Sequence, residues 1–209
     1  MQIVPPIRPE QSIQRLLALL TPIAEKINVV PRKRITWTHK NEPQLYLFLE
    51  GELSILRASD GLLIVTFYEP HLFGIAEMIQ PVRGHQLRAE TASTILSVNA
   101  RTAMDIFRQH TIWEDVTALL SYHMAYLFYR DALLVQQSNY SVIRNHLQEM
   151  GLLPEETRMR VTILEYIQDR TLLSRSSILN VLSALKSGNY IAFKRGGYLT
   201  EISHLPERF

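Results

Sequence analysis

Apolar and polar residues alternate in short runs between about Asn28 and Ala100. The runs are ITWTH, QLYLFLE, ELSILR, LLIVTFY and STILSV, and turn residues separate them at Gly51, Asp60-Gly61, Pro70 and Gly74. Successive side chains of a β-strand point to opposite faces, so this pattern predicts several short strands. Asp60-Gly61, between two such runs, is the clearest hairpin signal. Short strands at regular spacing predict a β-sandwich or jelly roll.

Three helices are predicted around these strands. Residues 10–26 carry apolar residues at helical spacing, and Pro22 predicts a kink or a break within them. We interpret this segment as a packing helix or a lid. Residues 102–109 predict a short helix. Residues 112–137 predict one long helix, because they contain neither Gly nor Pro.

The long helix carries an apolar stripe whose members recur every three or four residues. The stripe includes Val116, Leu119, Leu120, Met124, Leu127, Phe128, Leu134 and Val135. It is long for a helix that contacts only its own domain, so it predicts a seam between two paired helices of a dimer. The predicted seam residues are Val116, Leu120, Met124, Leu127 and Phe128. A core helix within one subunit is the alternative.

The C-terminal part of the chain has helical signals followed by a hairpin. Residues 140–150 predict a helix, and Pro154-Glu155-Glu156 begins another that runs to about Arg170. Ser174 is a favoured N-cap for the next helix, which spans 175–187.

The helix over 175–187 is followed by a turn and a β-hairpin. Gly188 is predicted at the C′ position that ends the helix. Behind it, NYIAFKRGGYLTEI predicts a hairpin that turns at Gly196-Gly197. Helix, short turn, capped helix and hairpin together predict a winged helix-turn-helix.

Two faces of the capped helix are distinguished by their residues. Ile178, Val181, Leu182 and Leu185 share one face and are predicted to pack on the preceding helix. The opposite face carries the candidate base-contact residues Arg175, Ser176, Leu179, Asn180 and Ser183. Arginine can bind guanine, and asparagine can bind adenine, with two hydrogen bonds each. Ser177 is predicted to cap the helix or bind phosphate, while Lys186, Lys194 and Arg195 are predicted to contact phosphates. A helix that packs on protein is the alternative.

Charge is distributed unevenly along the chain. The formal net charge is only +2, and residues 1–139 contain thirteen basic and thirteen acidic residues. From Arg158 to Arg195 there are seven basic residues against two acidic ones. This local excess favours a polyanionic partner, although a solvated charged face has the same composition.

Composition excludes several classes of site. The chain has no cysteine, which excludes disulfides, thiolate zinc sites and cysteine-ligated iron–sulfur clusters. The seven histidines have no metal-ligand spacing, and no catalytic constellation has a diagnostic spacing. We therefore expect neither an enzyme nor a bound metal or cofactor. No apolar run approaches the roughly 20 residues that span a bilayer, so we expect a cytoplasmic protein without membrane contact.

Three segments resemble the family of the catabolite activator and the fumarate–nitrate regulator. LYLFLEGELSILRASDGLLIVTFYEPHLFGIAEMI is similar to its cyclic-nucleotide-binding jelly roll, and HQLRAETASTILSVNARTAMDIF to the last strands and following helix. LSRSSILNVLSALKSGNYI resembles its recognition helix. The resemblance covers about residues 28–200. MRVTILEYIQDRTLLSR is slightly longer than the first helix and turn of the family, which predicts an extended helix or a looser turn.

The resemblance implies an α+β protein with three parts. These are a jelly-roll sensor domain over 1–110, a dimerisation helix over 111–138, and a winged helix-turn-helix DNA-binding domain over 139–209. It further implies a homodimer that binds double-stranded DNA at an inverted repeat. The alternative is a ligand-binding or protein-interaction module whose winged domain contacts another regulator.

The cyclic-nucleotide site of that family is degenerate in this sequence. The family has Glu after the glycine that corresponds to Gly74, whereas here Ile75 and Ala76 follow. Arg83 lies at the phosphate-binding position, but Gly84 replaces the hydroxyl residue that accompanies it. Glu77 fits the ribose-binding role only in a shifted register. We therefore expect no cyclic nucleotide, and the candidate pocket for an unknown small-molecule effector consists of Gly74, Ile75, Ala76, Glu77, Arg83 and Gly84.

Overall fold

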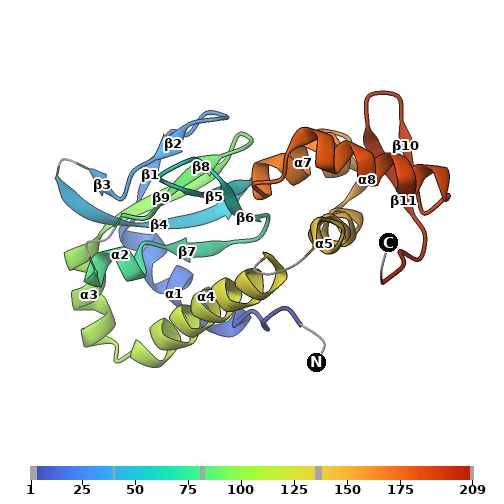
Figure 1. Ribbon diagram of the computed structural model, residues 1–209. Helices are drawn as coiled ribbons and strands as arrows, with labels where there is room; N and C mark the ends of the chain where they lie inside the picture. Colours follow the sequence, from blue (N-terminus) through green and yellow to red (C-terminus); the bar gives the residue numbers. More distant parts are fainter. Residues whose placement is uncertain (1–3, 40, 81–82, 135–137, 208–209) are drawn as a thin grey trace. The chain divides into compact units, whose positions relative to one another are not determined.

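The computed structural model describes residues 4–39, 41–80, 83–134 and 138–207, and they form two compact units (Figure 1). The N-terminal unit covers Val4–Phe128, and the C-terminal unit begins at Tyr129. Among the described helices, none combines the length and the apolar character that crossing a bilayer requires.

The N-terminal unit combines short strands with helices. Its helices are α1 (Glu10–Leu20), α2 (Ile75–Ile79), α3 (Ala100–Gln109) and α4 (Trp113–Leu134), and a 3₁₀ turn, η1, covers Thr21–Ile23. Its strands are β1 (Glu25–Ile27), β2 (Arg34–Ile35), β3 (Thr38–His39), β4 (Glu42–Glu50), β5 (Leu53–Arg57), β6 (Leu63–Phe67), β7 (His71–Phe73), β8 (His85–Ala89) and β9 (Thr94–Asn99). The last helix, α4, continues past the end of the unit at Phe128.

The strands form two antiparallel sheets, which confirms the predicted jelly roll. One sheet has the order β1-β9-β4-β3, with β7 also paired to β4, and the other has the order β2-β8-β5-β6. The hairpin between β5 and β6 turns at the predicted Asp60-Gly61, where Gly61 has a φ of +76°. The Arg57 guanidinium pairs with the Asp60 carboxylate across this turn.

Strand β4 separates two cores of the N-terminal unit. Leu45 and Leu47 face a cluster in which α1 and α3 contribute Leu16, Leu20 and Phe107. The alternate residues of β4 face the space between the two sheets, where Tyr46 and Phe48 pack with Trp37, Leu53, Phe73, Leu87 and Ile95. Because both faces are covered, residues 44–48 are buried without interruption. Figure 1 shows α1 and α3 on the β4–β7 side.

The N-terminal helix is shorter than the sequence predicts. It ends at Leu20, and Pro22 lies in η1 rather than in a second helical piece. Ala24 is already extended, and residues 25–27 form β1, a strand that was not predicted and that pairs with β9. Ser12, Ile13, Leu16, Leu17 and Leu20 are buried, so α1 is a packing helix. Its Arg15 Nε also donates to the Asp115 carboxylate of α4 at 3.1 Å.

The C-terminal unit is the predicted winged helix-turn-helix. Its helices are α5 (Asn139–Gly151), α6 (Glu155–Arg158), α7 (Ile163–Arg170) and α8 (Arg175–Ser187), and its wing consists of β10 (Ile191–Lys194) and β11 (Tyr198–Ile202). Ile143, Leu147, Ile167, Ile178, Leu185 and Leu199 are fully buried in one core shared by these elements.

Two local predictions in this unit are wrong. The single helix over 154–170 is divided, because the Thr162 side chain and Glu165 form a capping box that starts a new helix at Ile163. The helix α7 is therefore short rather than extended, and residues 171–174 connect it to α8. Gly188 is not left-handed, with a φ of −82°; the left-handed residue is Asn189. A Cβ at Gly188 would lie 2.5 Å from the Tyr190 ring, so the glycine gives this ring room.

Candidate functional site

Helix α8 is held in the C-terminal unit by its cap and by one apolar face. The Ser174 Oγ accepts a hydrogen bond from the Ser177 backbone N–H at 3.1 Å, as an N-cap does. Ile178, Leu182 and Leu185 are buried, and Val181 packs against the same core. The predicted packing face is thus confirmed, and it fixes which residues α8 exposes.

The opposite face of α8 is exposed and carries the predicted contact residues. Six of them lie on it and are exposed: Arg175, Ser176, Leu179, Asn180, Ser183 and Lys186. Ser177 is half-buried, and its hydroxyl lies 2.8 Å from the Ser174 Oγ, so the structure places it in the cap.

The wing lies beside this face of α8. Its turn contains Gly196 and Gly197, with φ values of +99° and +90°, which favour glycine. Lys194 and Arg195 are exposed next to the turn. The Ile163 backbone N–H donates to the Gly197 carbonyl at 2.9 Å, so the wing tip is attached to the start of α7. The two cations are therefore carried by a fixed turn.

A hollow of about 570 Å³ joins α7, α8 and the wing. Four predicted contact residues line it, namely Arg175, Leu179, Ser183 and Lys186. The Lys186 ammonium lies 4.3 Å from the centroid of the Phe193 ring of the wing, which ties the end of α8 to β10. Ser176 and Asn180 are exposed outside the lining of this hollow, and so are Lys194 and Arg195.

Two residues of this surface were missed from the sequence. Thr162 and Glu165 line the hollow and orient the start of α7 through their capping box. The Thr162 backbone N–H donates to the Glu165 carboxylate at 3.1 Å, and the Glu165 N–H donates to the Thr162 Oγ1 at 3.2 Å. The signal was present in the sequence, since Thr and Glu stand three residues apart before an apolar run.

The exposed stripe of α4 differs from the predicted seam. Val116 is only 1% exposed and belongs to the core of the N-terminal unit, so the prediction that it lies in the seam is wrong. Leu120 packs against the same core, whereas Met124, Leu127 and Phe128 are exposed large apolar side chains. Small residues, Ser121 and Ala125, lie on the exposed side of the helix next to Met124 and Phe128. Val135 lies outside the described residues.

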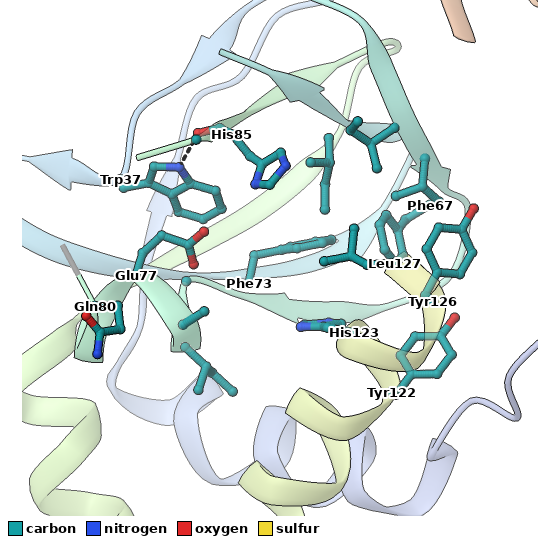
Figure 2. Close-up of a pocket in the computed structure, with 17 residues that line it drawn as sticks. Trp37, Phe67, Phe73, Glu77, Gln80, His85, Tyr122, His123, Tyr126 and Leu127 are labelled. Carbon is teal, nitrogen blue, oxygen red and sulfur yellow. Dashed lines mark hydrogen bonds between the residues drawn. The ribbon is translucent and has the colours of Figure 1, made fainter. Parts of the chain in front are cut away.

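A pocket of about 310 Å³ lies in the N-terminal unit, between the strands and α4 (Figure 2). Aromatic side chains of the strand region and of α4 line it. The strand region contributes Trp37, Phe67 and Phe73, and α4 contributes Tyr122 and Tyr126. The polar lining residues are Glu77, Gln80, His85 and His123. None of these aromatic or histidine residues was predicted, because the long-range packing of α4 brings them together.

Five of the six predicted pocket residues line this pocket: Gly74, Ile75, Ala76, Glu77 and Gly84. Arg83 is not among the described lining residues. Its Nη1 donates to the backbone carbonyls of Glu77 and Gln80 at 3.0 and 3.1 Å, so its guanidinium binds the end of α2.

Gly74 precedes α2 with a φ of +97°, and a Cβ there would lie 2.7 Å from the Gln44 carbonyl oxygen. Both the backbone conformation and β4 therefore exclude a side chain. We expect Gly74→Ala to lower the free energy of unfolding by about 2 kcal/mol or more. Gly84→Ala is the matched control, since a Cβ there meets nothing within 4 Å, and it should change stability by less than about 0.5 kcal/mol. Urea denaturation of both variants measures the difference, and equal stabilities would contradict the steric account.

Glu77 directs its carboxylate into the pocket, between Trp37 and Phe73 in Figure 2. Burial raises its pKa, and the nearby Arg83 charge opposes this only partly. The Trp37 Nε1–H does not pair with Glu77, because it donates to the His85 carbonyl at 2.6 Å. The Glu77 carboxyl group can therefore pair with another molecule.

A pair of histidines connects β7 to α4 at this pocket. The Nε2 atoms of His71 and His123 lie 2.8 Å apart, so one neutral ring donates a hydrogen bond to the other. Burial lowers the pKa of His123 to about 4, and burial next to His123 lowers the pKa of His71 well below its usual value. Both rings are thus uncharged at neutral pH. The Phe67 and Phe73 rings pack on His71, with centroids at 4.5 and 4.9 Å.

The chain is similar to one known domain family and to two proteins of known name. Residues 139–207 match the family of winged helix-turn-helix DNA-binding domains. The chain is 29% identical over 204 residues to the inhibitor of hydrogen peroxide resistance of Salmonella typhimurium, with 97% of this chain and 98% of the relative covered. It is 28% identical over 205 residues to the Escherichia coli protein of the same name, with the same coverage.

Solved structures of transcriptional regulators share this fold. The c-di-GMP-responsive global regulator CLP of Xanthomonas campestris superposes with a TM-score of 0.70 at 16% identity, covering 89% of this chain and 98% of that one. A regulator of the CRP/FNR family from Eubacterium rectale gives a TM-score of 0.64 at 14% identity, covering 90% of each chain. The resemblance predicted from the sequence is confirmed at the level of the fold, and the findings support a DNA-binding transcriptional regulator.

Proposed function

Since the chain carries a winged helix-turn-helix DNA-binding domain and has the fold of the catabolite-activator and fumarate–nitrate regulators, we propose that it is a homodimeric transcriptional regulator. In this proposal each subunit binds one half of an inverted-repeat promoter site. The N-terminal unit senses an effector other than a cyclic nucleotide.

The observation that carries the proposal is the exposed face of α8 beside the wing. Arg175 lies at the N-terminal end of α8, the part of a recognition helix that enters the major groove. Arg175 and Asn180 are exposed and have the donors and acceptors that read guanine and adenine. Lys194 and Arg195 are placed to bind phosphates, and such contacts position the protein without reading sequence.

Dimerisation is assigned to the exposed stripe of α4. Met124 and Phe128 are 56% and 68% exposed, and they lie one helical turn apart. Small side chains at Ser121 and Ala125 allow a second helix to approach closely. A two-fold pair of subunits would present two α8 helices to half-sites about 34–36 Å apart.

The degenerate cyclic-nucleotide site is supported by the position of Arg83. Its Nη1 donates to the carbonyls of Glu77 and Gln80, which holds the guanidinium at the end of α2, outside the described lining of the pocket. The curated relatives are named for inhibition of hydrogen peroxide resistance, and we extend that process to this chain: its target genes are those that determine survival in peroxide.

A second candidate is a protein-interaction module whose winged domain contacts another regulator. It is favoured by two exposed leucines of the helix-turn-helix, Leu172 in the turn and Leu179 on the recognition face.

Salt dependence of binding to promoter fragments tests the proposal. Each phosphate contact releases counterions and adds a slope of about −0.9 to the plot of log K against log salt concentration. With Lys194 and Arg195 contributed by two subunits, we expect a slope of about −4 from the wings alone. Fluorescence anisotropy of the full chain on labelled DNA measures it. Binding to another regulator without salt-dependent DNA binding would favour the second candidate.

A further inference from the structure

The pocket of the N-terminal unit has the size and the walls of a small-molecule site. Its volume of about 310 Å³ is at the lower end of the roughly 300–1,000 Å³ that is usual for ligand pockets. Trp37 and Phe73 supply flat apolar walls from the strand region, while Tyr122, Tyr126 and Leu127 close the pocket from α4 (Figure 2). Such walls bind flat rings through apolar burial and ring stacking.

The charges around the pocket disfavour an anion. None of the described residues that line it is lysine or arginine. Arg83 is held by the Glu77 and Gln80 carbonyls, and His123 is uncharged at neutral pH because burial lowers its pKa to about 4. The carboxyl group of Glu77 faces the pocket instead. An anionic ligand would lose its hydration and would face the Glu77 carboxyl group, with no lysine or arginine among the described lining residues.

The hydrogen-bonding groups indicate which polar atom a ligand should carry. The Trp37 Nε1–H is already used by the His85 carbonyl, and the His123 Nε2 is used by His71. The Glu77 carboxylate faces the pocket and accepts hydrogen bonds. A ligand that donates one hydrogen bond from a ring substituent would therefore pair with Glu77.

We propose that this pocket binds an uncharged aromatic molecule that carries a hydrogen-bond donor, such as an aromatic amine or a phenol. The proposal rests on the sensor role given to this unit in the proposed function, and it names the class of effector. The ring lies among Trp37, Phe73 and Tyr126, and the donor faces Glu77.

Two fluorescent probes that differ by one charged group test the proposal. N-phenylnaphthylamine is uncharged and has an aromatic N–H, whereas anilinonaphthalene sulfonate has the same ring system and a sulfonate. The chain has two tryptophans, so Trp113→Phe leaves Trp37 as the single donor for energy transfer to a probe in the pocket. In this background we expect the uncharged probe to quench Trp37 and to bind about tenfold or more tightly than the sulfonate.

Three further variants locate the probe and identify the group that selects it. Ala76→Phe, at an exposed lining position, should weaken binding of the uncharged probe about tenfold by filling the pocket. Glu77→Gln should reduce the difference between the two probes, because it removes the negative charge. Glu50→Gln is the matched control, since Glu50 is exposed and outside the described lining, and it should leave both affinities unchanged.

The outcomes separate this inference from the proposed function. Equal affinity for both probes, or binding that Ala76→Phe leaves intact, would overturn the assignment of ligand class. An unchanged preference in Glu77→Gln would overturn the role of Glu77. Binding of the same preparations to promoter DNA is measured in parallel. Probe binding without DNA binding would contradict the proposed function as a transcriptional regulator. DNA binding without selective probe binding would contradict only the proposed class of effector.

Discussion

The double variant Met124→Glu, Phe128→Glu is expected to be monomeric and to bind an inverted-repeat site far more weakly than the wild type. Both side chains are exposed on α4 and are apolar, so pairing of two such helices would remove them from water. Four carboxylates at the seam would repel each other and would have to be buried without partners. Since a dimer binds its second half-site as an intramolecular event, a monomer should bind DNA about a hundredfold or more weakly.

Sedimentation velocity and DNA anisotropy measure the two effects on the same samples. Ile7→Glu, Val30→Glu is the matched control, because it adds the same charge at exposed apolar positions outside α4. The control should remain dimeric and bind DNA like the wild type. A wild-type chain that is monomeric at high micromolar concentration would rule out the seam, as would a double variant that still dimerises.

The elements with strong local signals could be predicted from the sequence. Ser174 caps α8 and Asp60-Gly61 turns a hairpin, because capping and turn geometry depend on residues that are close in the chain. The same local reasoning failed where a signal was overlooked, as at Thr162 and Glu165, whose capping box divides the predicted helix over 154–170. Because the N-cap of α8 was predicted correctly, its buried and exposed faces could be predicted too, and with them the candidate DNA-binding surface.

Features that depend on long-range packing could not be predicted. The apolar residues of α4 satisfy one periodic pattern, but Val116 and Leu119 pack on the core of their own unit while Met124 and Phe128 remain exposed. Periodicity does not distinguish these two uses of an apolar side chain. Similarly, His71 and His123 are 52 positions apart and meet only because β7 packs near α4. The pocket and its charge balance follow from such contacts.

Arg175→Ala is expected to weaken binding to the cognate site by about 1–3 kcal/mol and to relax the preference at one base pair. The Arg175 side chain is exposed at the start of α8, where a bidentate contact to guanine would carry sequence information. Asn180→Ala should act in the same way but more weakly. Lys194→Ala or Arg195→Ala should instead weaken binding to all sequences, and should reduce the magnitude of the salt slope by about one unit for each phosphate that is no longer neutralised.

Competition with a library of single-base operator variants, at several salt concentrations, separates these two modes of binding. Arg101→Ala removes one exposed arginine in the N-terminal unit, so it is the matched control and should change neither affinity nor preference. The hydrogen bonds of Ser174 and the core packing of Ile178 do not involve the Arg175 side chain, so the variant should keep its fold. If a folded, dimeric Arg175→Ala protein retained both its affinity and its sequence preference, α8 would not be the reading helix. Its exposed Leu179 would then favour a protein partner for the winged domain.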